Sequence, residues 1–576
     1  MPRGHIFSPS RPRTLAPPAP LLPGSPAHPP PKKIFFLIKK SLRALLVLPL
    51  LLLSLPQYAQ SQVTKPNFIV ILADDLGYGD LGVYGAEKID TPNLDQMAAE
   101  GVRFTSFYSN STICTPTRTA FLTGRYSSRV GLDFIIPLTG AGSDQGLPAG
   151  ELTLPEVLKD AGYTTAIVGK WHLGHQDQYN PTLHGFDTWF GVPYSNSYND
   201  GDIPLYRDTQ IIENPVDQTY LTQRYTEEAL AFIEENAANP FLLYLPHTFP
   251  HIPLHASPDF QGTSEGGLYG DVVEEIDWSV GQILAKLASL GIDENTLVVF
   301  TSDNGPWTFQ GDSGGSPGPF FCGKGSFFEG GVRAPFIAWW PGTIEPGRVV
   351  GDLAATFDLF PTIANLAGAS LPAGTVIDAQ DIRGLLLGTG QRADDELVFT
   401  LDQIARGVRA EEWKLLLEYS GGPGWMDECG SEPHPLLLYN IQDDPGETTN
   451  LAAQYPGVVD YLEGEVSAFQ ESLAQPDNQP PVANFVSFPT GEDGLTLLFE
   501  ADPSFDADGN LVSYEWNFGD GAFGTGVQVT HTYAAYGRYV VTLRVEDDGG
   551  LSDGKLATLR LGNYFLPLIV SNPGAQ

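Results

Sequence analysis

The stretch that decides the fold of this chain is Ser111-Thr112-Ile113-Cys114-Thr115-Pro116-Thr117-Arg118-Thr119-Ala120-Phe121-Leu122-Thr123-Gly124-Arg125. It is predicted to pass from a loop into a helix, with Thr115 or Cys114 as the N-cap and Pro116 in the first turn. Free N–H groups at such a helix end favour an anion next to Cys114. Arg118 follows one turn later on the same face. The stretch therefore predicts a reactive group, an anion-binding helix end and a fixed cation at one place.

Two apolar runs on either side of this stretch are predicted to be buried strands that end in acidic residues. Residues 66–73 lead into Asp74 and Asp75, and residues 296–301 lead into Ser302 and then Asp303 and Asn304. Adjacent carboxylates at the end of a buried strand are costly unless a cation meets them. For a lone Asp-Asp pair, the alternative is that one side chain caps a turn and the other is solvated. Together the four side chains form an all-oxygen set that favours calcium or magnesium over zinc.

Basic and imidazole side chains follow two further predicted strands. Lys170 and His172 come after the strand predicted at 164–168, and in an extended segment they would point to the same side. Taken alone, such a pair is usually just the polar edge of a loop. After the strand predicted at 241–245 come His247, His251 and His255, and their proline-rich spacing does not match a standard zinc site.

A glycine-rich segment, Cys322-Gly323-Lys324-Gly325-Ser326-Phe327-Phe328-Glu329-Gly330-Gly331, supplies one more lysine. Its glycines allow the backbone to approach a ligand closely. The spacing of its glycine, lysine and serine residues is wrong for a P-loop. For a lone Gly-Lys pair, an ordinary surface lysine is the alternative interpretation of Lys324.

From about Pro66 to about Leu473, these motifs resemble the sulfatase family. The resemblance lies in the Cys-x-Pro-x-Arg pattern that starts at Cys114, the Asp-Asp opening, the Gly-Lys-Trp-His-Leu-Gly segment, a His-x-Pro element at His251 and the Gly-Lys-Gly-x-x-x-Glu-Gly-Gly segment. It implies an α/β fold like that of alkaline phosphatase, with a central mixed sheet flanked by helices and a small C-terminal antiparallel subdomain.

The resemblance also assigns roles to individual residues. It implies that Cys114 is oxidised to formylglycine, whose hydrate is the nucleophile, and that one calcium ion is bound by this residue together with Asp74, Asp75, Asp303 and Asn304. Arg118 is expected to orient the modified side chain, and Lys170 and Lys324 to bind sulfate. His251 is the candidate for protonating the leaving alcohol, and His172 for accepting a proton. Ser195, in a segment similar to arylsulfatase A-like members, is either a sulfate contact or a turn residue.

The chain has three cysteines, of which Cys322 and Cys429 could pair in an oxidising compartment. Two unrelated buried thiols are the alternative. In arylsulfatase A-like members, the cysteine that precedes the sulfate-binding lysine is bridged to the small subdomain, so the resemblance favours a Cys322–Cys429 disulfide.

The net charge of the 576-residue chain is −38, and its distribution excludes some partners. Residues 1–61 contain eight basic and no acidic residues, which leaves 23 basic against 69 acidic residues, or −46, for the remainder. No basic stripe is available to neutralise phosphates, so a nucleic-acid partner is not expected. For a sulfated polymer, local positive charge at the site would have to overcome the overall field.

The composition divides the chain into several predicted parts. Residues 1–61 are interpreted as a disordered N-terminus followed by a signal peptide, because basic residues precede a short apolar run and then small residues; an uncleaved anchor is the alternative. The signal peptide predicts a secreted or periplasmic protein. Short alternating strands from Val482 onward are typical of a β-sandwich, and Trp516-Asn517-Phe518-Gly519-Asp520-Gly521 resembles a PKD domain. The predicted parts after the signal peptide are the catalytic domain at 62–390, its subdomain at 391–474, a linker at 475–481, the β-sandwich at 482–562 and a tail at 563–576.

The predicted function is therefore that of a secreted sulfatase which hydrolyses an aryl or carbohydrate sulfate. Two alternatives are a phosphonate monoester or phosphodiester hydrolase of the same fold and a secreted binding protein without catalysis. The expected partners are a sulfated small molecule or glycan and a formylglycine-generating enzyme, and no oligomeric state is predicted. Three loops, at 133–150, 194–208 and 307–320, are expected to select the organic group of the substrate.

Overall fold

The computed structural model describes residues 65–372, 374–422, 429, 432–474, 480–490, 494–506 and 509–562. The predicted signal peptide, the predicted tail at 563–576 and residues 475–479 of the predicted linker lie outside these residues. Within the described ranges, no helix has both the length and the apolar character needed to cross a bilayer.

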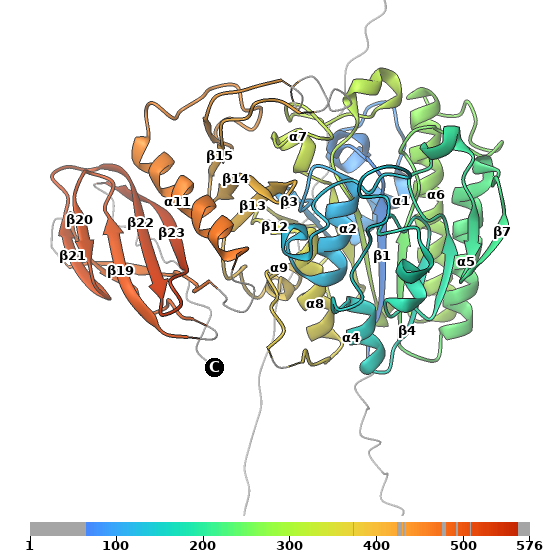
Figure 1. Ribbon diagram of the computed structural model, residues 1–576, viewed down its shortest axis with the longest axis horizontal. Coiled ribbons are helices and arrows are strands. Elements are labelled where there is room, and N and C mark those ends of the chain that lie inside the picture. The colour runs from blue at the N-terminus through green and yellow to red at the C-terminus, as the bar shows by residue number, and fades with distance from the viewer. Residues whose placement is uncertain are drawn as a thin grey trace, which may run out of the picture. The chain divides into compact units, whose positions relative to one another are not determined.

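A ten-stranded mixed sheet forms the centre of the catalytic part (Figure 1). Its middle consists of parallel strands in the order β9, β1, β8, β4 and β5, whereas β10 runs antiparallel to β9. The predicted mixed sheet is confirmed. In sheet order, the strands are β11 (Arg348–Val350), β2 (Val102–Phe104), β10 (Phe336–Trp339), β9 (Thr296–Ser302), β1 (Asn67–Ala73), β8 (Phe241–Pro246), β4 (Thr164–Val168), β5 (Thr188–Gly191), β6 (Leu205–Arg207) and β7 (Gln210–Glu213).

Helices cover both faces of this sheet, which explains why β1 is apolar throughout (Figure 1). Phe68 and Val70 point into one core and Ile69 and Ile71 into the other. The first core also contains side chains of α2 (Cys114–Thr123), α4 (Leu154–Asp160) and α8 (Leu359–Leu366). The second contains side chains of α1 (Pro92–Glu100), α5 (Leu221–Asn236) and α6 (Gly267–Leu290). Shorter elements are β3 (Phe107–Tyr108), β12 (Ala354–Ala355), α3 (Ser127–Val130), α7 (Glu329–Val332) and α9 (Arg383–Leu387).

A four-stranded antiparallel sheet follows the catalytic sheet, as predicted. It consists of β13 (Glu396–Leu401), β14 (Ile404–Ala410), β15 (Trp413–Leu416) and β16 (Leu437–Asn440), and α11 (Pro456–Ser472) packs against it. Lys414 is buried there and lies 2.8 Å from Glu329 Oε1 and 3.0 Å from Glu447 Oε1. The predicted disulfide between Cys322 and Cys429 is present. The Lys414–Glu329 ion pair and the disulfide both connect the glycine-rich segment of the catalytic part to the subdomain.

The C-terminal part is a sandwich of two antiparallel sheets, which confirms the predicted architecture. Both sheets contribute side chains to its core, among them Phe499 from the first and Trp516 and Leu543 from the second. The first sheet consists of β17 (Val486–Pro489), β18 (Thr496–Glu500) and β21 (Gln528–Thr532), and the second of β20 (Phe523–Thr525), β19 (Leu511–Asn517), β22 (Gly537–Asp547) and β23 (Ser552–Leu561).

Candidate active site

The acidic residues predicted as metal ligands meet at one edge of the central sheet. Asp74 and Asp75 follow β1, and Asp303 and Asn304 follow the neighbouring parallel strand β9, so the carboxyl ends of the two strands bring all four side chains together. The Asp75 backbone N–H donates to Asp303 Oδ1 at 3.2 Å, and Asn304 Nδ2 donates to Asp75 Oδ1 at 2.7 Å. All four are buried.

Helix α2 begins at Cys114 and places its sulfur against these carboxylates. Sγ lies 3.4 Å from Asp74 Oδ1. The prediction of Thr115 or Cys114 as the N-cap is wrong, because the capping position is taken by Ile113, in extended conformation and without a side-chain cap. The Thr115 hydroxyl instead donates to the His172 carbonyl oxygen at 3.1 Å, so it is used to hold the neighbouring loop.

Three buried cations face the three carboxylates. The Arg118 guanidinium donates to Asp303 Oδ2 at 2.8 and 3.0 Å, Lys170 forms an ion pair with Asp74, and Lys324 Nζ lies 2.7 Å from an Asp75 carboxylate oxygen. Although burial opposes ionisation, Lys170 and the other nearby cations hold the pKa of Asp74 well below its usual range. This pairing allows so many charges to be buried together.

The loop that carries Lys170 and His172 is not extended. The prediction that an extended backbone points both side chains to the same side is therefore wrong. Strand β4 ends at Val168, and the backbone then turns through Gly169 with a φ of 132° and His172 with a φ of 56°. A Cβ at Gly169 would lie 1.9 Å from the Pro246 carbonyl oxygen, so only glycine fits. Both nitrogens of the His172 ring are buried, and among the described residues neither has a hydrogen-bond partner.

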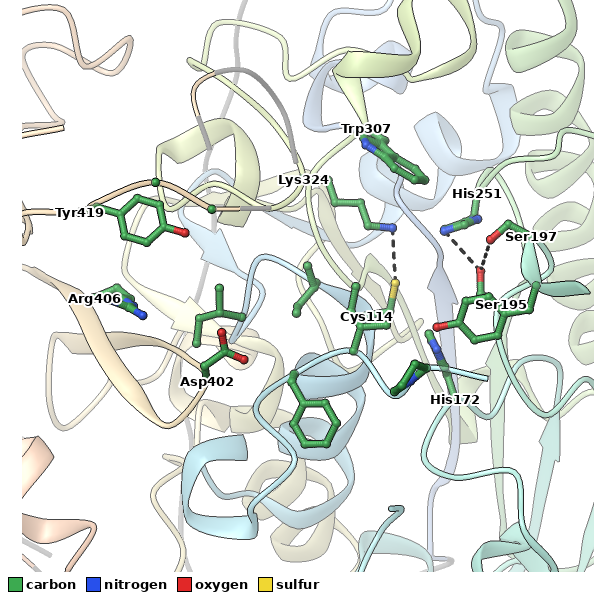
Figure 2. A pocket seen from close by; sticks show the side chains of 18 of the residues that line it. Cys114, His172, Ser195, Ser197, His251, Trp307, Lys324, Asp402, Arg406 and Tyr419 are labelled. Carbon is green, nitrogen blue, oxygen red and sulfur yellow. Dashed lines mark hydrogen bonds between the residues drawn. The ribbon is translucent and has the colours of Figure 1, made fainter. Parts of the chain in front are cut away.

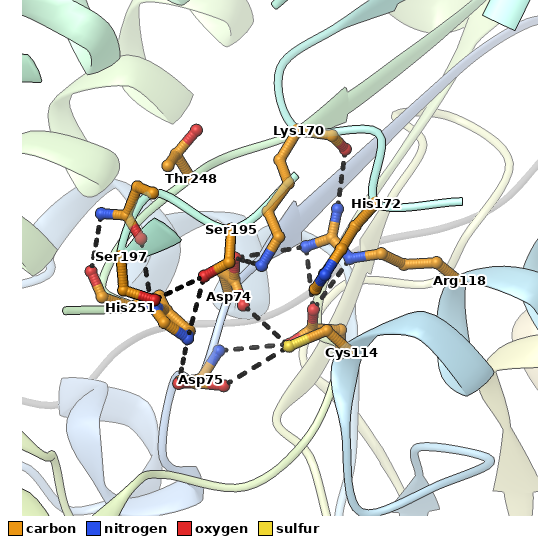
Figure 3. Close-up of polar contacts among 12 residues, drawn as sticks. Asp74, Asp75, Cys114, Arg118, Lys170, His172, Ser195, Ser197, Thr248 and His251 are labelled. Carbon is orange, nitrogen blue, oxygen red and sulfur yellow. Dashed lines mark hydrogen bonds and ion pairs between the residues drawn. The ribbon is translucent and has the colours of Figure 1, made fainter. Parts of the chain in front are cut away.

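His251 and Ser195 lie next to the carboxylates on the other side. His251 Nε2 is 3.4 Å from Ser195 Oγ and 3.6 Å from Asp75 Oδ2, so Ser195 faces the site (Figure 3). His251 Nδ1 is 2.6 Å from the Ile252 carbonyl oxygen, which can only accept, so Nδ1 carries the hydrogen. Burial and the Lys324 charge lower the pKa of His251 to about 4. The ring is therefore neutral at pH 7.

The other two histidines of this segment lie apart from the carboxylates. His247 is fully buried near Tyr225, and burial lowers its pKa to about 3. His255 is next to Phe249. Neither lines the cavity above Cys114.

A cavity of about 610 Å³ opens above Cys114 (Figure 2). All three loops that were predicted to select the substrate contribute to its wall, through Phe134, Tyr198 and Trp307 among others. The Trp307 ring centre lies 4.7 Å from Lys324 Nζ. The side chains of His172, Ser195 and His251 also line the cavity.

Sequence reasoning missed several residues of this wall. Asp402, Arg406 and Tyr419 reach the cavity from the antiparallel subdomain, where no local motif marked them (Figure 2). Asn196 was missed too, although it directly follows Ser195; its Oδ1 lies 3.0 Å from His251 Nδ1.

Comparison with known proteins identifies this arrangement. A family model described as "Sulfatase" matches residues 66–369, and one described as "PKD domain" matches residues 478–561. The chain belongs to the sulfatase family. This sulfatase is 42% identical to N-acetylgalactosamine-6-sulfatase of Canis lupus familiaris over 450 residues, which cover 70% of this chain and 85% of the relative. It is 36% identical to arylsulfatase G of Rattus norvegicus over 449 residues, which cover 69% and 84%.

A solved structure supports the same assignment. The PsFucS1 sulfatase from Pseudoalteromonas sp. superposes with a TM-score of 0.65 at 28% identity, covering 72% of this chain and 92% of that one. The chain is thus a sulfuric ester hydrolase of the alkaline phosphatase superfamily with a C-terminal PKD domain. The alternative of a binding protein without catalysis is set aside.

The residues of this sulfatase fit a hard metal ion. Asp74, Asp75, Cys114 and Asp303 each offer a ligand atom, all within 4.8 Å of one another. Among the described residues, the buried Asn304 Oδ1 has no hydrogen-bond partner. Burial and the charge of Asp74 raise the pKa of Asp303 to about 6 even beside Arg118, a cost that a dication would remove. Oxygen ligands of this kind suit calcium or magnesium.

Proposed function

We propose that this sulfatase hydrolyses a carbohydrate sulfate ester, with formylglycine made from Cys114 as the nucleophile and calcium as the metal. The observation that carries the proposal is the position of Cys114 at the floor of the cavity, between the Asp74 carboxylate and the Lys324 ammonium. Sγ lies 3.4 Å from the first and 3.6 Å from the second. A nucleophile placed there has a metal-ligand set on one side and a sulfate-binding cation on the other.

Asp74, Asp75, Asp303 and Asn304 are the residues that would hold calcium. Bound calcium would supply a Lewis acid that lowers the pKa of a hydroxyl and offsets charge on the sulfate. The chain itself orders the ligands, because Arg118 fixes Asp303 and also donates to the Lys170 carbonyl oxygen at 2.8 Å. Arg118 thus acts on the site by positioning its neighbours.

Cys114 itself is poorly suited to act as a thiolate. Burial, with Asp303 next in importance, raises the pKa of its thiol well above the ordinary value. A neutral thiol is a weak nucleophile. Oxidation to formylglycine replaces the thiol by an aldehyde, whose hydrate offers one hydroxyl for attack on sulfur and a second for release of the product. A formylglycine-generating enzyme is the proposed partner in maturation.

The lysines and histidines of the site supply charge neutralisation and proton transfer. Lys324 and Lys170 neutralise negative charge that develops on the sulfate oxygens, the kind of stabilisation that usually contributes most to catalysis. His251 gains its proton when the sulfate anion binds beside it, and Nε2 then donates that proton to the leaving alcohol. His172, whose two nitrogens have no partner among the described residues, is placed to accept a proton when the product is released.

The outer wall of the cavity favours a sugar as the alcohol part. Arg406 and Asp402 offer a cation and a carboxylate, and Tyr419 offers an aromatic face. Such mixed groups bind the hydroxyls and the C–H face of a pyranose. Because the curated relatives include N-acetylgalactosamine-6-sulfatase, a 6-sulfated hexosamine is the first substrate to test. We also propose secretion, because the predicted signal peptide and the disulfide both suit an oxidising compartment.

The decisive experiment combines mass spectrometry with paired substrates. The chain is produced with a formylglycine-generating enzyme, and the peptide that spans Cys114 is weighed. We expect the mass of this peptide to show formylglycine at position 114, which differs from cysteine by the loss of two hydrogens and one sulfur and the gain of one oxygen. We also expect calcium-dependent hydrolysis of N-acetylgalactosamine 6-sulfate, with phosphate diesters and phosphonate monoesters turned over more slowly. An unmodified thiol in an active enzyme would refute the nucleophile, and a preference for the phosphorus esters would establish the alternative hydrolase.

Arg406 provides the test of the sugar-binding wall. Replacing Arg406→Ala is expected to raise KM for a sugar sulfate roughly tenfold, since a charged hydrogen bond is lost. An aryl sulfate too small to reach Arg406 should be hydrolysed as before. Arg383→Ala, at a partly exposed position that does not line the cavity, serves as the control variant. Equal losses on both substrates would contradict a role in sugar recognition.

A further inference from the structure

A second group of carboxylates lies where the PKD domain contacts the sulfatase part. Glu396 belongs to β13, Glu465 to α11 and Asp553 to β23, so three separate elements each contribute one side chain. Their ligand oxygens all lie within 4.8 Å of one another. The three residues line a cavity of about 390 Å³ that is distinct from the one above Cys114.

The charges of this group are poorly compensated. Glu465 is only 4% exposed, and its Oε1 accepts no hydrogen bond from any described residue. The cation paired with it is Arg544, whose Nη1 is 3.9 Å away and whose side chain is 38% exposed. The two arginines that line the cavity, Arg129 and Arg392, form ion pairs with Asp378 and Asp358 instead.

The remaining contacts hold the carboxylates in place without neutralising them. The Tyr461 hydroxyl donates to Glu396 Oε1 at 2.7 Å, and the Ala483 backbone N–H donates to Asp553 Oδ2 at 2.6 Å. Burial, opposed by the charge of Arg544 and reinforced by that of Asp394, raises the pKa of Glu465 to about 7. In their ionised form, three largely buried acids with one distant arginine are unfavourable unless another positive charge is present.

We propose that Glu396, Glu465 and Asp553 bind a divalent cation of the calcium class at the contact between the PKD domain and the sulfatase part. The donor atoms are all oxygens, which calcium prefers. Two oxygens at calcium-bonding distance lie at most about 5.2 Å apart, and the observed separations satisfy that limit. The Oε1 atom of Glu465 accepts no hydrogen bond from a described residue, so its lone pairs are available to a cation.

This cation would join two parts of the chain that are far apart in sequence. Two ligands come from the sulfatase part and one from the PKD domain, so binding strengthens the contact between α11 and β23. Helix α11 and strand β23 already lie close together there. A Cβ atom added to Gly554 would lie only 2.4 Å from Glu465 Oε1. The site goes beyond the proposed function, since none of its residues lines the catalytic cavity.

The test counts calcium ions bound to the full chain. Equilibrium dialysis against calcium alone is expected to give two ions per wild-type chain. Asp553→Asn, which can still accept from the Ala483 N–H, should lose one ion, and Glu465→Gln should lose the same one. Asp303→Asn should lose the other, and the Asp303→Asn/Asp553→Asn chain should bind none. Glu463→Gln, two residues from Glu465 on the exposed side of α11, is the matched control and should retain two.

A thermal readout separates the site from a folding defect. In the Asp303→Asn background, calcium should raise the melting temperature, and Glu465→Gln should abolish that rise while leaving the melting temperature in EDTA unchanged or higher. A chain with Asp303→Asn that binds no calcium would overturn the proposal. So would Asp553→Asn and Glu465→Gln variants that retain the wild-type number of ions.

Discussion

The two groups of buried carboxylates in this sulfatase are compensated in different ways. Beside Cys114, three carboxylates face Arg118, Lys170 and Lys324. At the contact with the PKD domain, the group of Glu396, Glu465 and Asp553 faces Arg544 at 3.9 Å. The substrate of the first group is an anion, so fixed cations serve both the metal ligands and the sulfate. No anion has to be attracted at the second group, and under our proposal a bound divalent cation balances its charge together with Arg544.

The largest expected difference between the two groups concerns turnover. Asp303→Asn should lower kcat by on the order of a thousandfold or more, because it removes a charged metal ligand and the partner of Arg118. Asp553→Asn should leave hydrolysis of an aryl sulfate within about twofold of wild type. Steady-state kinetics on both purified variants checks this. Comparable losses in both would mean that the PKD contact controls catalysis and that the two groups are not independent.

The lysines provide a smaller contrast. Lys324→Ala should lower kcat by roughly a hundredfold, since it removes one cation that faces the developing sulfate charge. Lys555→Ala is the matched control: this lysine is also paired with carboxylates, Asp395 and Glu411, but at the PKD contact. It should have no effect on kcat. If Lys324→Ala retained full turnover, the assignment of that lysine as a sulfate ligand would be wrong.

The smallest expected effect is on the free energy of unfolding, and it comes from a surface ion pair between the PKD domain and the sulfatase part. Arg538 of β22 forms an ion pair with Glu412, and its side chain is partly exposed. Arg538→Ala should lower the free energy of unfolding by about 1 kcal/mol or less, because exposed pairs are screened by solvent. Urea unfolding in calcium and in EDTA would measure it. A loss larger than that caused by removing calcium would show that this pair, and not the carboxylate group, holds the PKD domain.

Much of the catalytic site could be predicted because it depends on local patterns. Asp74 and Asp303 follow apolar runs, and such runs predict buried parallel strands whose ends meet. The features that were missed depend on contacts between distant segments. The hydroxyl of Thr115 donates to the His172 carbonyl oxygen and does not cap its own helix. The sequence of the helix alone does not predict this contact with a distant loop. Arg406 reaches the cavity from a different sheet, and the carboxylates of the second group meet only once the PKD domain has docked.

The burial of Cys114 has a consequence for the order of events during biosynthesis. This residue is 1% exposed at the start of α2, closed in by the ends of β1 and β9 and by the loop that carries Lys324. A second protein that must hold this cysteine in its own catalytic centre has no access to it in the folded chain. The oxidation that we propose therefore has to take place on the nascent or still unfolded polypeptide, before residues 303 and 324 close over it. Maturation and folding are then competing processes, and conditions that speed folding should lower the fraction of chains that become active.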